Sequence, residues 1–283
     1  MTATQDVATT QDVAMRVAPE YARTWLLRAA TRPPEAEARQ RADAVVLDLE
    51  DGVPAAHKDA ARVTAARWFA AGGCAWVRIN AVDTPHWRAD IAAVGTWQGV
   101  QGVMLAKSES GEHVARTRNA LGDRLPVIAL IESALGVEEA VRIAQVPGVF
   151  RLAFGTGDYR RDTGTAATDL AMAYPRSRLV IASRIATLPG PIDGPTLDPD
   201  HDVVRARTRT AIELGMTGKL TLDETQAPVI NQAASPSTAE VTRARRLLRS
   251  FEDRGGDVAD GSELPALGRS RRVCELADAY GLG

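Results

Sequence analysis

From Thr24 onward, short apolar runs alternate with longer amphipathic stretches at intervals of about 25 to 30 residues, a rhythm typical of repeated β–α units. The runs are continuously apolar, as in Val45–Leu47 and Val127–Ile131, which is typical of parallel strands covered on both faces. The pattern predicts strands over Thr24–Arg28, Ala44–Leu49, Ala75–Asn80, Gly102–Lys107, Val127–Glu132, Phe150–Gly155, Gly190–Gly194 and Gly218–Leu222.

The amphipathic stretches between these runs predict a matching set of helices. Eight strands, eight helices and no break in composition favour an α/β fold of the closed (β/α)8 type, a TIM barrel, over an open Rossmann sheet, whose glycine-rich fingerprint is missing. The predicted helices are Pro33–Arg41, Ala55–Ala71, His86–Trp97, Gly111–Leu121, Val137–Gln145, Thr168–Leu188, Asp202–Leu214 and Thr225–Gln232.

Both ends of the chain fall outside this count. Residues 1–20 are polar and contain Thr-Gln-Asp-Val-Ala twice, which predicts a disordered tail before a barrel over residues 21–234. Residues 235–283 form a C-terminal extension, in which Ser235-Pro236-Ser237 caps a helix over Thr238–Glu252 and a last helix runs from about Leu267 to Tyr280. From the residues alone, this extension is either packing material or a lid over a neighbouring active site.

Composition narrows the possible partners and compartment. The 36 acidic and 34 basic residues of the 283 nearly balance, and no Lys/Arg-rich run appears, which argues against nucleic acid as the main partner. No apolar run reaches the roughly 18 residues of a membrane span, and the N-terminus lacks signal-peptide order, so we expect a cytoplasmic protein without membrane contact. Cys74 and Cys274 lie in no CxxC motif and are expected to be buried or idle thiols.

Charged residues close most of the predicted strands, where a barrel of this class carries its reactive groups. One acidic residue after a strand is ordinarily a helix cap or a solvated loop residue, but four carboxylates at one barrel mouth would repel one another unless a cation neutralised them. An all-oxygen set suits Mg²⁺, and zinc is disfavoured because no His or Cys lies nearby. The four candidates are Glu50, Asp51, Glu132 and Asp158.

Arg78 and Lys107 place positive charge at the ends of two adjacent strands. Since an Arg fork holds a carboxylate in two parallel hydrogen bonds, this pair implies an anionic substrate; the alternative is a structural salt bridge to the acidic cluster. Ser133 has no base for a triad, and the histidines lie in predicted helices or their approaches, which leaves metal-assisted enolate chemistry. Those histidines are His57, His86, His113 and His201.

The strand ends resemble those of the citrate lyase beta subunit-like branch of the HpcH/HpaI aldolase superfamily, over about residues 24–275. Each motif is modest alone, but their order and spacing together are specific. They are Asp48-Leu49-Glu50-Asp51-Gly52, Val77-Arg78-Ile79-Asn80, Lys107-Ser108-Glu109-Ser110, Ala129-Leu130-Ile131-Glu132-Ser133-Ala134-Leu135-Gly136, Phe154-Gly155-Thr156-Gly157-Asp158 and Gly218-Lys219.

The resemblance implies Mg²⁺ held by Glu132 and Asp158, with Glu50 and Asp51 holding the metal's waters. It also implies that Arg78 grips the carboxylate of an oxo acid such as oxaloacetate, pyruvate or glyoxylate. Members cleave or form a carbon–carbon bond between such an acid and an acyl-CoA or acyl carrier thioester. They commonly form homo-oligomers, trimers or hexamers, in which the C-terminal segment covers the neighbouring subunit's site. The expected catalytic residues are Arg78, Lys107, Glu50 and Asp51, and the expected substrate-binding residues are Arg78, Gly155, Thr156 and Gly157.

Three departures from the family pattern bear on the acyl partner. The usual Cys-Ile-His-Pro-x-Gln reads Thr221–Gln226 here, the usual Phe-x-Pro-Gly loop is altered over Arg28–Glu35, and the usual lid Asp is Pro265. Two hypotheses therefore stand, a Mg²⁺-dependent carbon–carbon lyase or aldolase and an oxo-acid-binding regulatory barrel without catalysis. A purely structural barrel with salt-bridged strand ends is a third. Either Glu263 or Asp260 is a candidate replacement for the lid acid.

Overall fold

The computed structural model describes residues 17–258 and 260–282 and confirms a closed barrel of eight parallel strands in chain order, with β8 pairing back onto β1. Every strand ends within two residues of its predicted limits. The strands are β1 (Thr24–Ala29), β2 (Ala44–Asp48), β3 (Ala75–Ile79), β4 (Val100–Leu105), β5 (Val127–Ile131), β6 (Val149–Phe154), β7 (Ile192–Asp193) and β8 (Gly218–Thr221).

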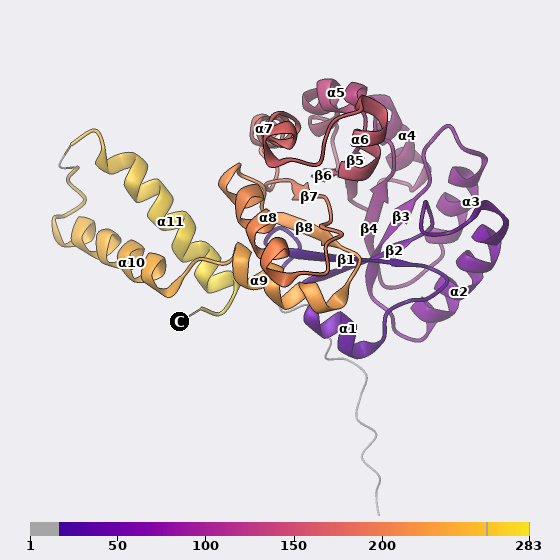
Figure 1. Cartoon of the computed structure of the whole chain (residues 1–283), viewed down its shortest axis with the longest axis horizontal. Helices are drawn as coiled ribbons and strands as arrows, with labels where there is room; N and C mark the ends of the chain where they lie inside the picture. The colour runs from indigo at the N-terminus through magenta and orange to yellow at the C-terminus, as the bar shows by residue number, and fades with distance from the viewer. Residues whose placement is uncertain (1–16, 259, 283) are drawn as a thin grey trace, which may run out of the picture.

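Helices surround the barrel (Figure 1), and one of them was not predicted. No helix was predicted between the sixth strand and Thr168, whereas α6 (Thr156–Thr163) lies there; it is short and polar and has no apolar periodicity to reveal it. The other helices around the barrel are α1 (Ala36–Arg41), α2 (Lys58–Ala70), α3 (Pro85–Val94), α4 (Gly111–Ala120), α5 (Ala134–Ala144), α7 (Asp169–Ile185), α8 (His201–Glu213) and α9 (Ala227–Ala234), with 3₁₀ turns at Ala55–His57 and Glu224–Gln226.

The barrel interior is apolar on its N-terminal side and charged at its C-terminal mouth. Trp25 packs edge-on against Trp76 with ring centroids 5.5 Å apart, and Trp76 stacks on Phe150 at 5.2 Å. Because side chains alternate across a strand, inward-facing Trp76 places Arg78 on the same face two residues later. The same alternation carries Ala44 and Val46 to Asp48, and Ile128 and Leu130 to Glu132.

Beneath these aromatic rings lies Arg151, a fully buried cation whose hydrogen bonds go to uncharged oxygens. Its guanidinium donates to the carbonyls of Pro19, Ala22 and Gly190 and to the Thr217 hydroxyl, at 2.9 to 3.2 Å. The last residues of the predicted tail, 17–20, are therefore packed against the barrel rather than free, and Val17 is buried. The remainder of the predicted tail, residues 1–16, lies outside the described residues.

The C-terminal extension forms a helical hairpin that projects from the barrel body (Figure 1). It consists of α10 (Thr238–Asp253), which starts at the predicted cap Ser237 with a complete capping box, and α11 (Glu263–Ala279). Its base is anchored beside the start of β1, where Tyr280 donates to the Tyr21 carbonyl and lies under Arg23. That anchor is at the N-terminal end of the strands, away from the mouth.

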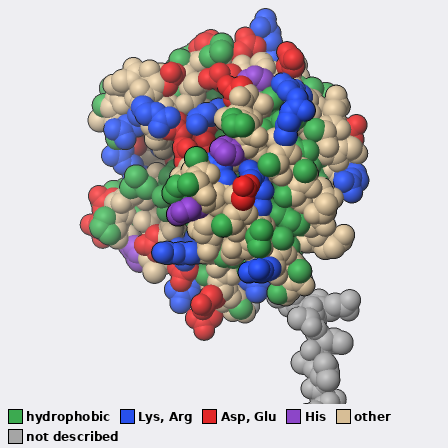
Figure 2. Space-filling view, turned by 90° about the vertical axis from the view of Figure 1, so that its right-hand side faces the viewer, with side chains coloured by type: hydrophobic (Ala, Val, Ile, Leu, Met, Phe, Trp, Pro, Cys, Tyr) green, Lys and Arg blue, Asp and Glu red, His purple; other side chains and the backbone are tan. Residues whose placement is uncertain are grey.

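Three further findings concern the surface charges, the helices and the cysteines. Acidic and basic side chains are interspersed over the face shown in Figure 2, consistent with the balanced composition. Within residues 17–258 and 260–282, none of the helices has both the length and the apolar character needed to cross a membrane. The two cysteines, expected to be buried or idle thiols, are both free; Cys74 is exposed before β3 and Cys274 is partly buried.

Candidate active site

Asp48, at the end of β2, organises the first charged loop of the mouth. Its carboxylate accepts from the backbone N–H of Glu50 at 2.8 Å and of Gly52 at 2.7 Å, so the loop folds back over the strand end. A Cβ on Gly52 would lie 2.4 Å from Asp48 Oδ2. Glycine is therefore required where the loop closes on this carboxylate.

Arg78 is fixed by the same carboxylate. Its Nε and Nη2 donate to the two oxygens of Asp48 at 2.7 and 2.6 Å, a bidentate pair that sets the plane of the guanidinium. The remaining nitrogen, Nη1, faces Glu50 Oε2 at 3.3 Å. The neighbouring carboxylates hold the pKa of Arg78 above its usual value despite burial, so the guanidinium stays charged.

Lys107 connects the acidic side chains of two different strands. It follows β4 with a φ of 50°, a left-handed conformation unusual for a residue with a side chain. Its backbone N–H donates to Glu132 Oε1 at 2.8 Å, and its ammonium donates to Glu50 Oε1 at 3.0 Å. One residue thus contacts both carboxylates, and strained backbone of this kind is concentrated at functional sites.

Glu132 is the most perturbed acid of the mouth. It is only 4% exposed, and Gly155 lies so close that a Cβ there would meet Glu132 Oε2 at 2.4 Å. Burial, opposed by Arg78 and reinforced by the negative charges of Glu50 and Asp158, raises the pKa of Glu132 to about 8. The side chain sits where a negative charge is poorly compensated.

The other predicted site residues separate into two groups. Asp158 lies in the first turn of α6, close enough to act on the Glu132 charge, and pairs with Arg161 at 2.8 Å. Asp51 is exposed at the rim, with its backbone N–H bound to Glu50. Thr156 and Gly157 line a separate cavity on the other side of the β6–α6 turn.

Two buried residues that support the mouth were not selected from the sequence. Asp48 was part of a quoted motif, but its pairing with Arg78 depends on the neighbouring strand and has no local signal. Lys58, at the start of α2, donates to the carbonyls of Leu49 and Glu50 at 2.7 and 2.9 Å. Burial lowers the pKa of Lys58, and nothing in its sequence setting distinguishes it from a surface lysine.

The donor chemistry of the mouth fits a hard divalent cation. Three buried acids, Asp48, Glu50 and Glu132, face two cations, Arg78 and Lys107, so that ionisation of all three leaves an excess of negative charge, which agrees with the raised pKa of Glu132. Among the described residues, no three His, Cys, Asp or Glu side chains converge as a complete metal cage. A site built from two carboxylates, with waters and substrate oxygens filling the other positions, is what Mg²⁺ prefers.

The residues considered as lid acids lie at the distant end of the hairpin. Pro265 is in the first turn of α11, Glu263 pairs with Arg254, and Asp260 accepts from the Ser262 backbone and hydroxyl at 2.7 and 2.5 Å. Since the base of the hairpin is beside β1, the hairpin does not fold over the mouth of its own barrel in this structure.

The fold and mouth define a (β/α)8 barrel with an oxygen-rich anionic site at the C-terminal strand ends. The HpcH/HpaI aldolase/citrate lyase family model matches residues 24–223, and the model of the HpcH/HpaI aldolase C-terminal domain matches residues 239–281. The chain belongs to the HpcH/HpaI aldolase/citrate lyase family, as the strand-end motifs suggested.

Individual relatives show how this family varies. A citrate lyase subunit beta-like protein of Deinococcus radiodurans is 33% identical over 74% of this chain and 78% of its own length. A (3S)-malyl-CoA thioesterase of Cereibacter sphaeroides is 30% identical over 78% and 80%. The structure of the citrate lyase beta subunit from Mycobacterium tuberculosis complexed with oxaloacetate and magnesium matches with a TM-score of 0.67 and 30% identity, over 77% of this chain and 99% of the other.

Proposed function

We propose that this protein is a Mg²⁺-dependent carbon–carbon lyase or aldolase that acts on a 2-oxo acid and an acyl partner. The observation that carries the proposal is the buried Glu132 carboxylate, held by the Lys107 N–H and adjoining two other acids beside a fixed guanidinium. The oxaloacetate and magnesium in the related M. tuberculosis structure support the same ligand classes. A divalent cation would neutralise the carboxylates of this mouth, and an anionic substrate would pair with its guanidinium.

In this proposal Glu132 and Asp158 hold the ion, and Glu50 and Asp51 hold its waters. When bound, Mg²⁺ supplies Lewis-acid stabilisation of negative charge on the oxygens of the oxo acid. Lys107 keeps Glu50 and Glu132 apart and oriented, because its ammonium and its backbone N–H each bind one of them.

Arg78 orients the substrate. Asp48 occupies Nε and Nη2, so the guanidinium plane is fixed before substrate arrives, and Nη1 is the nitrogen that a substrate carboxylate would share with Glu50. The two early interpretations of Arg78, structural pairing and substrate binding, are therefore compatible. The buried pair positions the residue, and the third nitrogen recognises the anion.

The acyl partner is the part of the reaction in which this chain departs from its relatives. Glu224, in the altered loop after β8, lies 3.6 Å from Arg28 at the end of β1. In this partly exposed pair, Glu224 neutralises Arg28, a cation that would otherwise attract phosphate groups at that rim. We propose an acyl thioester such as an acyl-CoA as the partner class, and the malyl-CoA thioesterase relative makes thioester hydrolysis the second reaction to assay.

The hairpin of α10 and α11 is proposed to act as a lid in a homo-oligomer, over the mouth of another copy of the chain. Its anchor at the opposite end of its own barrel supports this arrangement. The missing acid at Pro265 favours, as the second candidate, a barrel that binds an oxo acid without turning it over.

A turnover assay separates these candidates. The protein is incubated with Mg²⁺ and malyl-CoA, citramalyl-CoA or citrate, and released oxo acid and free thiol are measured separately. Oxo acid without free thiol indicates carbon–carbon cleavage, and free thiol indicates hydrolysis. Both activities should disappear with EDTA or in Glu132→Gln and persist in Glu139→Gln, a control on the exposed side of α5 that pairs with Arg142. Binding without turnover of any substrate supports the regulatory barrel.

A further inference from the structure

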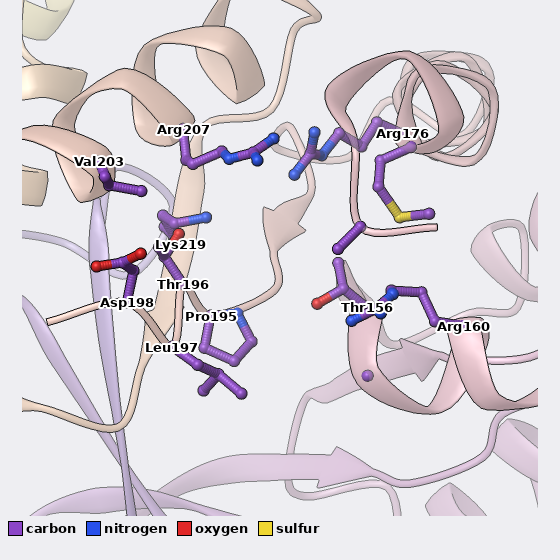
Figure 3. A pocket seen from close by; sticks show the side chains of 13 residues that line it. Thr156, Arg160, Arg176, Pro195, Thr196, Leu197, Asp198, Val203, Arg207 and Lys219 are labelled. Atoms are coloured by element: carbon purple, nitrogen blue, oxygen red, sulfur yellow. The ribbon is translucent and has the colours of Figure 1, made fainter. Parts of the chain in front are cut away.

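A second cavity lies beside the mouth, on the outer side of β7 and β8, and nothing in the proposed reaction uses it. It has a volume of about 280 Å³ and is enclosed by α6, α7, α8 and the segment after β7 (Figure 3). This size is at the lower limit of ligand sites, about 300 Å³, and so suits a small molecule rather than a large cofactor.

Basic side chains outnumber acidic ones in the lining of this cavity, although Asp193 and Asp169 beside it already pair with three of them. Four basic side chains line it, and Asp198 is the one acid in the lining. In Figure 3 Asp198 lies on the opposite side from Arg176, and its carboxylate already accepts from the Asp200 N–H at 2.9 Å. The basic residues are Arg160, Arg176, Arg207 and Lys219.

Arg176 supplies the most specific observation. It is 5% exposed, and its Nε and Nη2 bind the fully buried Asp193 at 2.8 and 3.1 Å, while Lys219 donates to the same carboxylate at 2.7 Å. The third nitrogen, Nη1, is buried without a hydrogen-bond partner and makes a long ion pair of 3.6 Å with the half-exposed Asp169. A buried guanidinium nitrogen without an acceptor costs free energy, so the site favours an added anion.

Arg207 completes a two-pronged arrangement. Figure 3 shows its guanidinium and that of Arg176 facing each other across the cavity, with Thr156 below them. Arg207 comes from α8 and donates to the half-exposed Asp169. The lining also includes apolar side chains, among them Met172, Pro195 and Val203. A ligand for this cavity therefore has an anionic head and a short apolar stem.

We propose that this cavity is a binding site for a small organic anion, whose carboxylate or phosphate group is held by Arg176 and Arg207. The site is distinct from the mouth but shares the β6–α6 turn with it, since Gly155 contacts Glu132 while Thr156 and Gly157 line the cavity. The inference does not rest on the proposed function, because no metal and none of the charged residues of the mouth takes part in it.

Calorimetric titration of the full-length, EDTA-treated protein at low ionic strength tests the proposal, with butyrate and inorganic phosphate as probes. We expect at least one of them to bind. Tighter binding of butyrate identifies a carboxylate with an apolar stem as the preferred chemistry, and tighter binding of phosphate identifies a phosphate group. Arg207→Gln should weaken binding about tenfold, the usual effect of losing one charged hydrogen bond.

Two further variants keep the outcome decisive. Val203→Trp fills the cavity and should abolish binding, whereas Arg205→Gln, two residues from Arg207 but paired with Gln232 and Asp202, should leave it unchanged. The affinity should also be the same in Glu132→Gln, which separates this site from the mouth. Absence of binding by both anions, or binding that survives both Arg207→Gln and Val203→Trp in folded protein, would overturn the proposal.

Discussion

The backbone N–H of Lys107 donates to Glu132 Oε1 across 2.8 Å, from a residue whose φ of 50° is left-handed. The same conformation lets the Lys107 ammonium reach Glu50 on the other side. One residue with a strained backbone therefore orients two acids from different strands. The two hydrogen bonds offset the energetic cost of that backbone conformation.

Replacement of Lys107 separates its two roles. Lys107→Met removes the ammonium but keeps the backbone N–H, so we expect Glu50 to lose its orientation while Glu132 stays in place. Oxo-acid binding should weaken by about tenfold, the scale of one charged hydrogen bond, with a small effect on the melting temperature. Titration of oxaloacetate in the presence of Mg²⁺, alongside thermal unfolding, measures both; unchanged affinity would show that the Glu50 contact is dispensable.

Gly155→Ala tests the close packing at Glu132. The new Cβ would lie 2.4 Å from Glu132 Oε2, so the carboxylate must move. We expect about 1–3 kcal/mol of destabilisation from overpacking and at least a tenfold loss of Mg²⁺-dependent oxo-acid binding. Gly268→Ala in α11, where nothing lies within 4 Å of the added Cβ, is the matched control and should be neutral or slightly stabilising. Equal behaviour of the two variants would contradict this account of the turn.

Asp48→Asn examines the support of Arg78. The amide keeps the shape of the side chain but leaves the guanidinium without its bidentate anion, so unfolding free energy should fall by about 3–5 kcal/mol and substrate affinity should fall with it. Urea unfolding quantifies the first effect. Asp59→Asn, whose carboxylate is fully exposed in its pair with Arg62, should change stability by less than about 1 kcal/mol. A comparable loss in both variants would argue against a special role for Asp48.

The Asp193 network gives a prediction for acid pH. Burial opposes ionisation of Asp193, but Lys219 and Arg176 outweigh it and hold the pKa of the carboxyl below its ordinary value of 3.8. Its contribution to stability is therefore present above about pH 4 and is lost as the pH falls through the lower, folded-state pKa.

Asp193→Asn should accordingly cost about 3–5 kcal/mol at pH 7, because it leaves two buried cations unpaired. Urea unfolding of both proteins from pH 7 down to pH 3 measures the difference, which should shrink only at the acid end. A difference that stays constant over the whole range would show that the charge of Asp193 is not the cause.

The predictable part of this protein is the part specified by local pattern. Short apolar runs at intervals of about 25 to 30 residues located the strands, and the period of two carried Arg78 and Glu132 to the inward face, because each strand alternates regardless of its neighbours. The charged strand ends identified the mouth for the same reason.

What could not be predicted depends on contacts between distant segments. Helix α6 has no apolar periodicity, so the turn after β6 was expected to carry Gly155, Thr156 and Gly157 to one site. In the structure the helix begins at Thr156; Gly155 lies against Glu132, and Thr156 and Gly157 line the neighbouring cavity. The occupation of the Arg78 fork by Asp48 likewise depends on the register of β2 against β3, which no single segment encodes.

We propose above all that Glu132 and its neighbours bind an oxo acid through a divalent cation. Calorimetric titration of the metal-stripped protein with oxaloacetate, pyruvate or glyoxylate, with and without Mg²⁺, tests it most directly, with Glu132→Gln and Glu139→Gln compared. We expect that oxo-acid binding requires Mg²⁺, is lost in Glu132→Gln and is retained in Glu139→Gln. Binding that is equally strong without Mg²⁺ or in Glu132→Gln, or no binding in any combination, would contradict it.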